Sequence, residues 1–374
     1  MKQVVIAGYA RTPFTLANKG ELIRVRPDEL AAAAVKGLMA KTGIDGKEIE
    51  DLTMGCAFPE GEQGFNIARL VVLMAGLPLS VGGVTINRFC GSSMQGIHQA
   101  AGAIQMNAGH AFICAGVESM TRIPMPGFNP SPNPKLYEAM PSAYISMGIT
   151  AENLASKYGI SRQEQEAFTV TSHQKAAAAQ QAGKLADEII AVGSVTQDGC
   201  IRPDTTLETL ASLKLAFDEK GTVTAGTSSP LTDGASATLV CSEEFAKAHG
   251  LPILARIKSI AISGCAPEIM GIGPVLSSQK ALERAGITAQ DLDIIELNEA
   301  FASQSLACIR DLGLDMAKIN LDGGAIALGH PLGATGARIT GKAAALLKRE
   351  GKQFALASQC IGGGQGIATI LEAV

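Results

Sequence analysis

The chain has 374 residues, of which 47% are hydrophobic and 42 are glycine, and it contains no tryptophan. This length exceeds one ordinary core and predicts two domains or a duplicated one, built from tightly packed α/β layers. A net charge of −4 provides no overall basic field, which argues against a nucleic-acid partner.

The eight cysteines do not indicate a disulfide framework in a chain of this length, and no C-x-x-C pair points to zinc. Residues 1–3 lead directly into an apolar strand at 4–6, so we expect no secretory leader. No apolar run reaches the ~18 residues that span a bilayer. We therefore expect a cytoplasmic protein whose reduced thiols can act as catalysts.

A helix, a glycine cap and an acidic link into a strand occur twice, at 38–52 and again at 281–295. Each copy is followed later by a helix rich in small residues and then an apolar strand. The expected helix and strand pairs are 94–106 with 111–114 and 337–347 with 354–357. We interpret this pattern as two copies of one α/β unit.

The repeat leaves an unmatched middle stretch that is too long for a plain connection. It begins with a proline-rich segment, which is incompatible with regular helix or central strand, and continues with helices expected at 150–158 and 161–181. Ser161 opens the second helix with a sequence resembling a capping box. The predicted parts are an N-terminal half at 1–120 completed by 231–252, a loop domain at 121–230 over a substrate site, and a C-terminal half at 253–374.

Cys90 lies between a strand expected at 84–86 and the helix that follows it. Residues 87–93 read Asn-Arg-Phe-Cys-Gly-Ser-Ser, and the glycine allows the backbone to come close. A thiol at a helix N-terminus feels the positive end of the dipole, which favours the thiolate. The alternative is a small buried hydrophobic residue. With the motifs below, we interpret Cys90 as a nucleophile.

Asn298 follows a strand expected at 294–297, and strand ends are where α/β folds usually place chemistry. Its side chain can hold a water molecule or donate to an oxyanion. It can also cap the helix expected at 300–312, and the two roles are compatible.

His330 stands between a glycine and a proline in the segment 323–333, which we expect to be too flexible to need a core imidazole. A histidine base within reach of Cys90 completes a cysteine–histidine pair, and the alternative is a loop histidine packed for shape. The other histidines lack such surroundings and are assigned no function: His98, His110, His173 and His249.

Cys360 ends a strand and precedes the glycines at 362–364. One interpretation is a turn that needs glycine beside an incidental cysteine. The other is a second catalytic thiol that moves a proton at a substrate carbon, with a glycine N–H aimed at an oxyanion. The remaining cysteines are expected to be core or incidental: Cys56, Cys114, Cys200, Cys241, Cys265 and Cys308.

With these residues in place, the chain resembles the thiolase family of acetyl-CoA acyltransferases over essentially its whole length. Four motifs carry the resemblance in the family's order, at 87–93, 298–301, 329–331 and 360–366. The resemblance implies an α/β fold with two duplicated βαβαβαββ halves, which form a layered α/β/α/β/α core, and an inserted loop domain.

The resemblance also implies a role for each site residue. Cys90 takes the acyl group, His330 activates that thiol, and Cys360 moves the proton of the acetyl-CoA carbanion. One oxyanion hole combines His330 with a water held by Asn298, and the second uses the backbone N–H groups of Cys90 and Gly362. The implied reaction is cleavage of 3-ketoacyl-CoA by CoA, with no tightly bound cofactor.

In the family, the loop domain grips coenzyme A, which here acts as the co-substrate. The matching positions in this chain are Met147 and Ser229, and Arg202 and Lys214 are candidates for the phosphates. The segment 213–217 departs from the family's pattern, which usually has arginine and then proline at this point.

Segments 62–69, 90–95 and 227–229 look like those of degradative 3-ketoacyl-CoA thiolases of bacterial β-oxidation. Ser146 stands where biosynthetic acetoacetyl-CoA thiolases usually show a histidine. The alternatives are a short-chain enzyme that condenses two acetyl-CoA, a decarboxylating ketosynthase of related fold and a non-catalytic acyl-CoA-binding subunit. Family habit implies a homodimer or homotetramer, and in some bacterial complexes a hydratase/dehydrogenase subunit as a partner.

Overall fold

Ten strands form one continuous sheet in the computed structural model, which describes residues 2–374. The strands are β1 (Val4–Arg11), β2 (Thr15–Leu16), β3 (Asp51–Gly55), β4 (Gly82–Ile86), β5 (Ala111–Ser119), β6 (Thr232–Ser242), β7 (Ala255–Gly264), β8 (Ile294–Leu297), β9 (Phe354–Ile361) and β10 (Gln365–Glu372). Their order is β4-β3-β5-β6-β1-β7-β10-β9-β8, and β2 pairs with β6. The two halves meet where β1 pairs with β7, through Val5 with Arg256 and Ile6 with Ala255.

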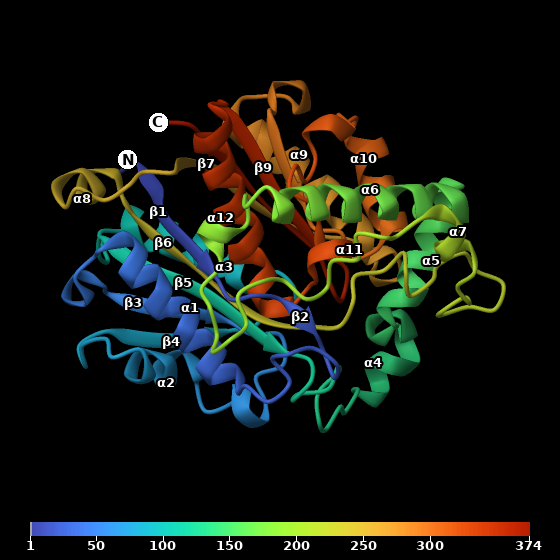
Figure 1. Cartoon of the computed structure of the whole chain (residues 1–374), viewed down its shortest axis with the longest axis horizontal. Helices are drawn as coiled ribbons and strands as arrows, with labels where there is room; N and C mark the ends of the chain where they lie inside the picture. The colour runs from blue at the N-terminus through green and yellow to red at the C-terminus, as the bar shows by residue number, and fades with distance from the viewer. Residues whose placement is uncertain (1) are drawn as a thin grey trace.

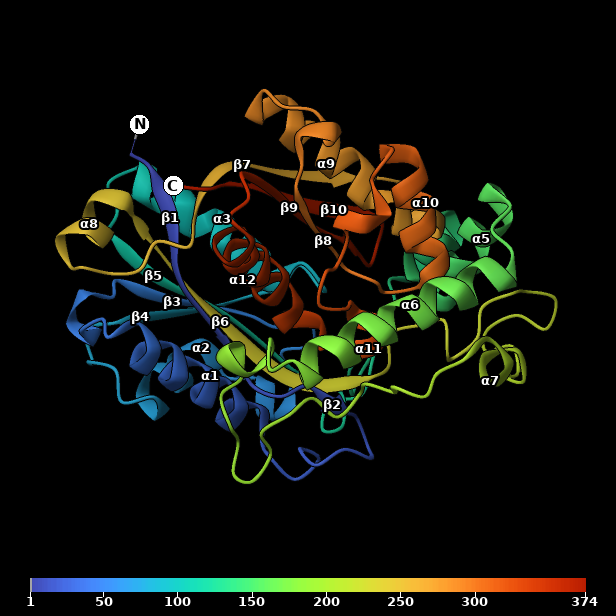
Figure 2. The ribbon, with the colours of Figure 1, turned by 45° about the horizontal axis from the view of Figure 1, so that its top comes forward.

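Helices cover both faces of the sheet and also fill the space between its halves (Figure 1, Figure 2). The principal helices are α1 (Pro27–Thr42), α2 (Ile67–Met74), α3 (Ser92–Gln105), α9 (Gly273–Ala285), α10 (Ala302–Leu312) and α12 (Leu332–Glu350). α1 and α2 pack on the outer face of the first half, and α9 and α10 on the outer face of the second. α3 and α12 lie in the middle, so most strands are buried on both faces and are rich in aliphatic residues, whereas β4 and β7 are partly exposed.

The expected duplication is confirmed, with one difference between the halves. α1 and α9 both end at a left-handed glycine, Gly43 with φ 70° and Gly286 with φ 69°. Each is followed by a short 3₁₀ turn and a parallel strand, β3 or β8. In the second half, the counterpart of β4 is reduced to an isolated bridge between Ile295 and Ile319.

The chain between β5 and β6 carries its own helices, α4 (Pro134–Ala139), α5 (Met147–Tyr158), α6 (Arg162–Gln181) and α7 (Leu207–Ala211). Ser161 caps α6 with the expected reciprocal capping box. The expectation that the proline-rich segment holds no helix is wrong at its end, because Pro134 starts α4 at a position that does not need its N–H. No helix among residues 2–374 is both long and apolar enough to cross a membrane.

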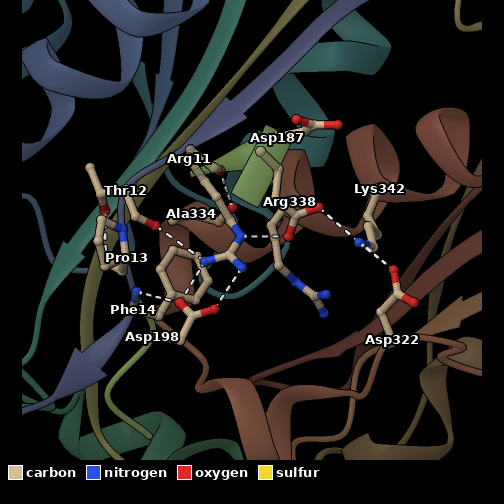
Figure 3. A network of polar contacts seen from close by, with 12 residues as sticks. Arg11, Thr12, Pro13, Phe14, Asp187, Asp198, Asp322, Ala334, Arg338 and Lys342 are labelled. Carbon is tan, nitrogen blue, oxygen red and sulfur yellow. Dashed lines mark hydrogen bonds and ion pairs between the residues drawn. The ribbon is translucent and has the colours of Figure 1, made fainter. Parts of the chain in front are cut away.

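A buried network of charges ties this insertion to the central core (Figure 3). Arg11 on β1 contacts Asp198 at 2.6 Å and Glu188 at 2.9 Å, both from the insertion. Lys342 on α12 contacts Glu188 at 2.8 Å and Asp322 at 2.7 Å. Removing one partner from such a network leaves an uncompensated buried charge, so the insertion is held to one position on the core.

The two central helices approach each other closely in the core. A Cβ atom at Gly336 of α12 would lie 2.3 Å from the backbone nitrogen of Met94 in α3. One residue further, the backbone N–H of Ala337 donates to Ser93 Oγ at 2.8 Å. Only glycine at position 336 allows the two backbones to approach this closely.

This contact predicts that Gly336→Ala lowers the free energy of unfolding by about 1–3 kcal/mol, because the added methyl group must push α12 away from α3. Gly102→Ala is the matched control, since Gly102 lies in α3 with no atom within 4 Å of its added Cβ. That change should raise stability by up to about 1 kcal/mol. Urea unfolding at one protein concentration measures both, and an equal response of the two variants would contradict the packing argument.

Candidate active site

Cys90 sits in a tight turn between β4 and α3. The residue before it, Phe89, has φ 43°, a left-handed conformation that is strained for a bulky side chain. The turn is held by side chains: Asn87 Oδ1 accepts from the Phe89 N–H at 2.8 Å, and Ser92 Oγ accepts from the Arg88 N–H at 2.9 Å. The strain is therefore balanced locally, and the thiol is presented just before the first turn of α3, which begins at Ser92.

The hairpin of β9 and β10 holds this turn from the other half of the chain. Gln359 on β9 donates to the Cys90 carbonyl, and Arg88 Nη1 donates to Gln365 Oε1 at 2.8 Å. The hairpin turn itself is glycine, at 362–364. These contacts place the C-terminal glycine turn directly beside the first cysteine.

His330 lies between α11 (Ala325–Leu328) and α12, and its side chain is buried. Its ring Nδ1 is 2.6 Å from Thr335 Oγ1, and its backbone N–H donates to Thr232 Oγ1 at 3.1 Å. The expectation of a flexible segment is wrong, because residues 322–335 are buried throughout. The buried carboxylate of Glu299 organises the segment, since it accepts from Asn320 Nδ2 at 2.7 Å and from the Ile326 N–H at 3.2 Å.

The Asn298 side chain reaches the histidine ring. Its Nδ2 lies 3.4 Å from His330 Nε2, and its Oδ1 is buried without a hydrogen-bond partner among residues 2–374. The alternative role as a helix cap is wrong, because α10 begins at Ala302 and its N-cap position is Phe301. The amide is therefore free to orient a polar group of a ligand or a water molecule.

The histidine segment also meets the first cysteine. Leu332, two residues after His330, shares one apolar cluster with Cys90. Glu118, at the end of β5 and fully buried, accepts from the Gly333 N–H at 2.9 Å. Because Glu118 also accepts backbone N–H groups from the loop after β3, it joins both halves at this point.

Burial keeps the titratable groups of the site neutral. It raises the pKa of Cys90 to about 12, and a hydrogen bond from the Gly362 N–H offsets only part of that rise. Burial raises the pKa of Cys360 well above its usual value, and the adjacent Cys90 raises it further. Burial, and then the charge of Arg338, lowers the pKa of His330 to about 3. Desolvation therefore opposes the thiolate form that the start of a helix favours at Cys90.

One of the residues expected to contact CoA lies beside Cys360 and Gly362. Met147, at the start of α5, packs in the apolar cluster of Cys360, and its Sδ would lie 3.6 Å from a Cβ on Gly362. Ser229 is held to the segment after Asn298, because its N–H donates to the Ala300 carbonyl at 2.9 Å.

The two cationic candidates differ from each other. Arg202 is turned to His173, with Nη2 3.0 Å from His173 Nε2 and the backbone N–H 3.1 Å from Nδ1. Lys214 is exposed in the insertion, close in sequence to Phe217, which packs against Phe301. Residues 2–374 hold no group of three or more His, Cys, Asp or Glu side chains arranged to bind a metal ion.

Three residues that contact the site were not singled out from the sequence: Arg88, Gln359 and Glu118. Glu118 had a readable signal, because it is a lone carboxylate at the end of an apolar strand. Gln359 and Arg88 had none, since their partners are a backbone carbonyl and a glutamine far away in the chain. Such pairings depend on how the two halves dock.

A doubled α/β core that gathers two thiols, an imidazole and an amide places the chain among the acyltransferases. Two family models match it: "Thiolase, N-terminal domain" over residues 4–244 and "Thiolase, C-terminal domain" over residues 251–373. The chain belongs to the thiolase family.

Relatives that match the whole chain carry the same type of name. The 3-ketoacyl-CoA thiolases of Shewanella sp. (strain MR-7) and Shewanella oneidensis are each 51% identical over 388 residues, with 100% of both chains covered. The crystal structure of human mitochondrial 3-ketoacyl-CoA thiolase superimposes with a TM-score of 0.92 at 38% identity, covering 100% of this chain and 99% of that one. A second structure of the human protein, in complex with CoA, has the same TM-score and identity and is covered to 98%.

The pKa directions predict how the Cys90 thiol reacts with iodoacetamide. The thiol stays protonated and the imidazole stays neutral at neutral pH, so the imidazole can accept the proton as the thiol reacts. The alkylation rate of Cys90 should therefore be nearly constant between about pH 6 and 9. His330→Ala should slow it about 100-fold at neutral pH and make it rise about tenfold per pH unit.

Mass spectrometry of the peptide that contains Cys90 measures this rate separately from those of the other cysteines. Thiolate absorbance, taken as the difference from Cys90→Ala, separates a neutral pair from a thiolate–imidazolium pair. Strong thiolate absorbance at neutral pH would contradict the neutral resting state.

Proposed function

We propose that the chain catalyses the thiolytic cleavage of 3-ketoacyl-CoA by CoA, yielding acetyl-CoA and a shortened acyl-CoA, in fatty-acid β-oxidation. The observation that carries this proposal is the meeting of Cys90, Cys360 and the Gly362 N–H beside the His330–Asn298 pair. The names of the full-length relatives support the degradative direction.

In the first half-reaction, the Cys90 sulfur attacks the 3-keto carbon while His330 takes the thiol proton. The oxyanion that forms is stabilised by hydrogen-bond donors, and the bond between C2 and C3 of the substrate then breaks. The acyl group stays on Cys90, and the electron pair goes to the acetyl-CoA fragment as an enolate. Cys360 donates a proton to that carbon and acetyl-CoA leaves.

In the second half-reaction, the thiol of CoA attacks the carbonyl of the acyl-cysteine and releases the shortened acyl-CoA. Between the half-reactions, the proton that His330 took from Cys90 returns to the Cys360 thiolate; His330 then takes the CoA thiol proton and gives it to the departing Cys90 sulfur, so the cycle is balanced. We assign one oxyanion hole to His330 with a water held by Asn298, whose Oδ1 has no partner among residues 2–374. The other consists of the backbone N–H groups of Cys90 and Gly362, and the second of these already bonds the resting thiol.

We assign CoA binding to a loop domain at 121–230 that covers the site. It lies between an N-terminal half at 1–120, which is completed by 231–252, and a C-terminal half at 253–374. Met147 supports this role most strongly, because it packs beside Cys360. Ser229 and the exposed Lys214 are further candidates for the pantetheine and the phosphates. Arg202 is the weakest candidate, since its guanidinium is engaged with His173.

We further propose a homo-oligomer that works in the cytoplasm, with a hydratase/dehydrogenase subunit as an additional partner. The sheet ends at β4, whose outer edge pairs with no other strand among residues 2–374 and whose Val84 side chain is exposed. An open apolar edge of this kind is a natural place for a second copy to pair. The free cysteines fit a reducing compartment.

The roles of the Cys90 and Cys360 thiols should be distinguishable by measuring exchange and cleavage separately. Cys360→Ala should lower the cleavage of 3-ketoacyl-CoA by about 10²–10⁴-fold, because the enolate loses its proton donor. The exchange of labelled CoA into acyl-CoA should persist, since it needs only the acyl group on Cys90. Cys90→Ala should lose both reactions, and Cys308→Ala, at another buried cysteine of the same half, should lose neither.

Acetoacetyl-CoA and a long-chain 3-ketoacyl-CoA are the two substrates for this assay. Equal loss of exchange and cleavage in Cys360→Ala would contradict the division of roles. Cleavage of acetoacetyl-CoA alone by the unmodified chain would move the assignment to a short-chain enzyme. Cleavage by Cys90→Ala would exclude the covalent route.

A further inference from the structure

Strand β8 and helix α12 contact each other at two levels. At the first level, Asn298, just past the end of β8, meets His330 at 3.4 Å, and His330 contacts Thr335 in the first turn of α12. At the second level, Glu296 on β8 accepts a hydrogen bond from Arg338 Nη1 on α12 at 3.2 Å. Both contacts therefore join the same strand to the same helix.

The spacing makes the two levels move together. Glu296 and Asn298 are two residues apart on an extended segment, so their side chains project from the same face. Thr335 and Arg338 are three residues apart on a helix and also share a face. A shift of β8 along α12 that broke the ion pair would displace Asn298 from His330 by a similar amount.

The ion pair is completely enclosed, with side-chain exposures of 1% for Arg338 and 0% for Glu296. Arg338 Nε and Nη2 and Glu296 Oε1 have no other hydrogen-bond partner among residues 2–374. A buried ion pair with so few other hydrogen bonds contributes little to stability. Two apolar side chains of similar volume in its place often give a protein that is equally stable or more stable. Because it joins one side chain of β8 to one side chain of α12, the pair can fix the register between the two elements.

Charged groups from several elements surround the ion pair and shift the pKa of Glu296. Lys342 on α12, Asp322 before α11 and Glu188 in the insertion all act on Glu296, which in turn acts on Tyr9 of β1 and Lys175 of α6. Figure 3 shows Arg338 between Arg11 and Lys342 in this network. Burial raises the pKa of Glu296 to about 7, against the opposing pull of Arg338 and Lys342, so the carboxylate is ionised above neutral pH.

We propose that Glu296 and Arg338 are positioning residues that hold the Asn298 amide against His330 while the reaction proceeds. The inference rests on the proposed function, because it concerns the same oxyanion-binding pair. Neither residue touches the substrate. They affect the reaction through the position of the Asn298 side chain, whose Oδ1 has no hydrogen-bond partner among residues 2–374.

The test is kcat for cleavage of 3-ketoacyl-CoA at about pH 8, above the pKa of Glu296. Glu296→Gln keeps the side-chain shape and removes the charge. It should lower kcat about tenfold and leave KM for CoA within about twofold, since small displacements of catalytic groups are costly in rate. In an Asn298→Ala background, the same change should lower kcat by less than about twofold, because the group that it positions is gone.

Arg349→Met is the matched control on α12, because it breaks the ion pairs with Asp322 and Glu350 near the far end of the same helix. It should lower Tm and keep kcat within about twofold. Arg338→Lys retains the charge in a folded protein and should reproduce a smaller loss of kcat with an unchanged KM for CoA.

Three results would overturn the positioning role in an enzyme whose unmodified form is active. They are an unchanged kcat in Glu296→Gln, an equal tenfold loss in the Asn298→Ala background, and an equal loss of kcat in Arg349→Met. An unmodified chain that cleaves no 3-ketoacyl-CoA would instead contradict the proposed function, and the positioning role with it.

Discussion

The close approach of α3 and α12 is the constraint on which the rest of the structure depends. Gly336 allows the α12 backbone to reach Met94, and the neighbouring bond from Ala337 to Ser93 locks the contact. Because Cys90 lies two residues before the start of α3 and His330 two residues before the start of α12, the same packing decides where both reactive groups lie. Duplication of one α/β unit thus supplies two equivalent helix starts, and docking of the halves makes them one site.

Burial sets the chemistry of that site. Desolvation raises the pKa of both cysteines and lowers the pKa of the histidine, so the resting groups are neutral. A neutral thiol beside a neutral imidazole can transfer its proton only as charge develops on the reacting carbonyl, where fixed N–H donors such as that of Gly362 can stabilise it. The enclosed ion pair of Glu296 and Arg338 acts further from the reaction, on the geometry of the donors.

Much of the fold could be predicted from local sequence. The glycine caps, the Ser161 capping box and the repeated helix–strand pattern follow from rules that act over a few residues. Other features depend on the docking of the two halves and could not be predicted. Among them are the bond from Gln359 to the Cys90 carbonyl, the raised pKa of the thiols and the reduction of one strand to the Ile319 bridge.

Direct observation of the acyl group is the most decisive measurement. The chain is mixed with a long-chain 3-ketoacyl-CoA in the absence of free CoA, quenched in acid, digested and analysed by mass spectrometry. We predict a shortened acyl group on Cys90, released when CoA is added before the quench, with one equivalent of acetyl-CoA formed. An acyl group on Cys360, or acetyl-CoA formed without any acyl-enzyme, would contradict a site in which the two thiols divide nucleophile and proton donor between them.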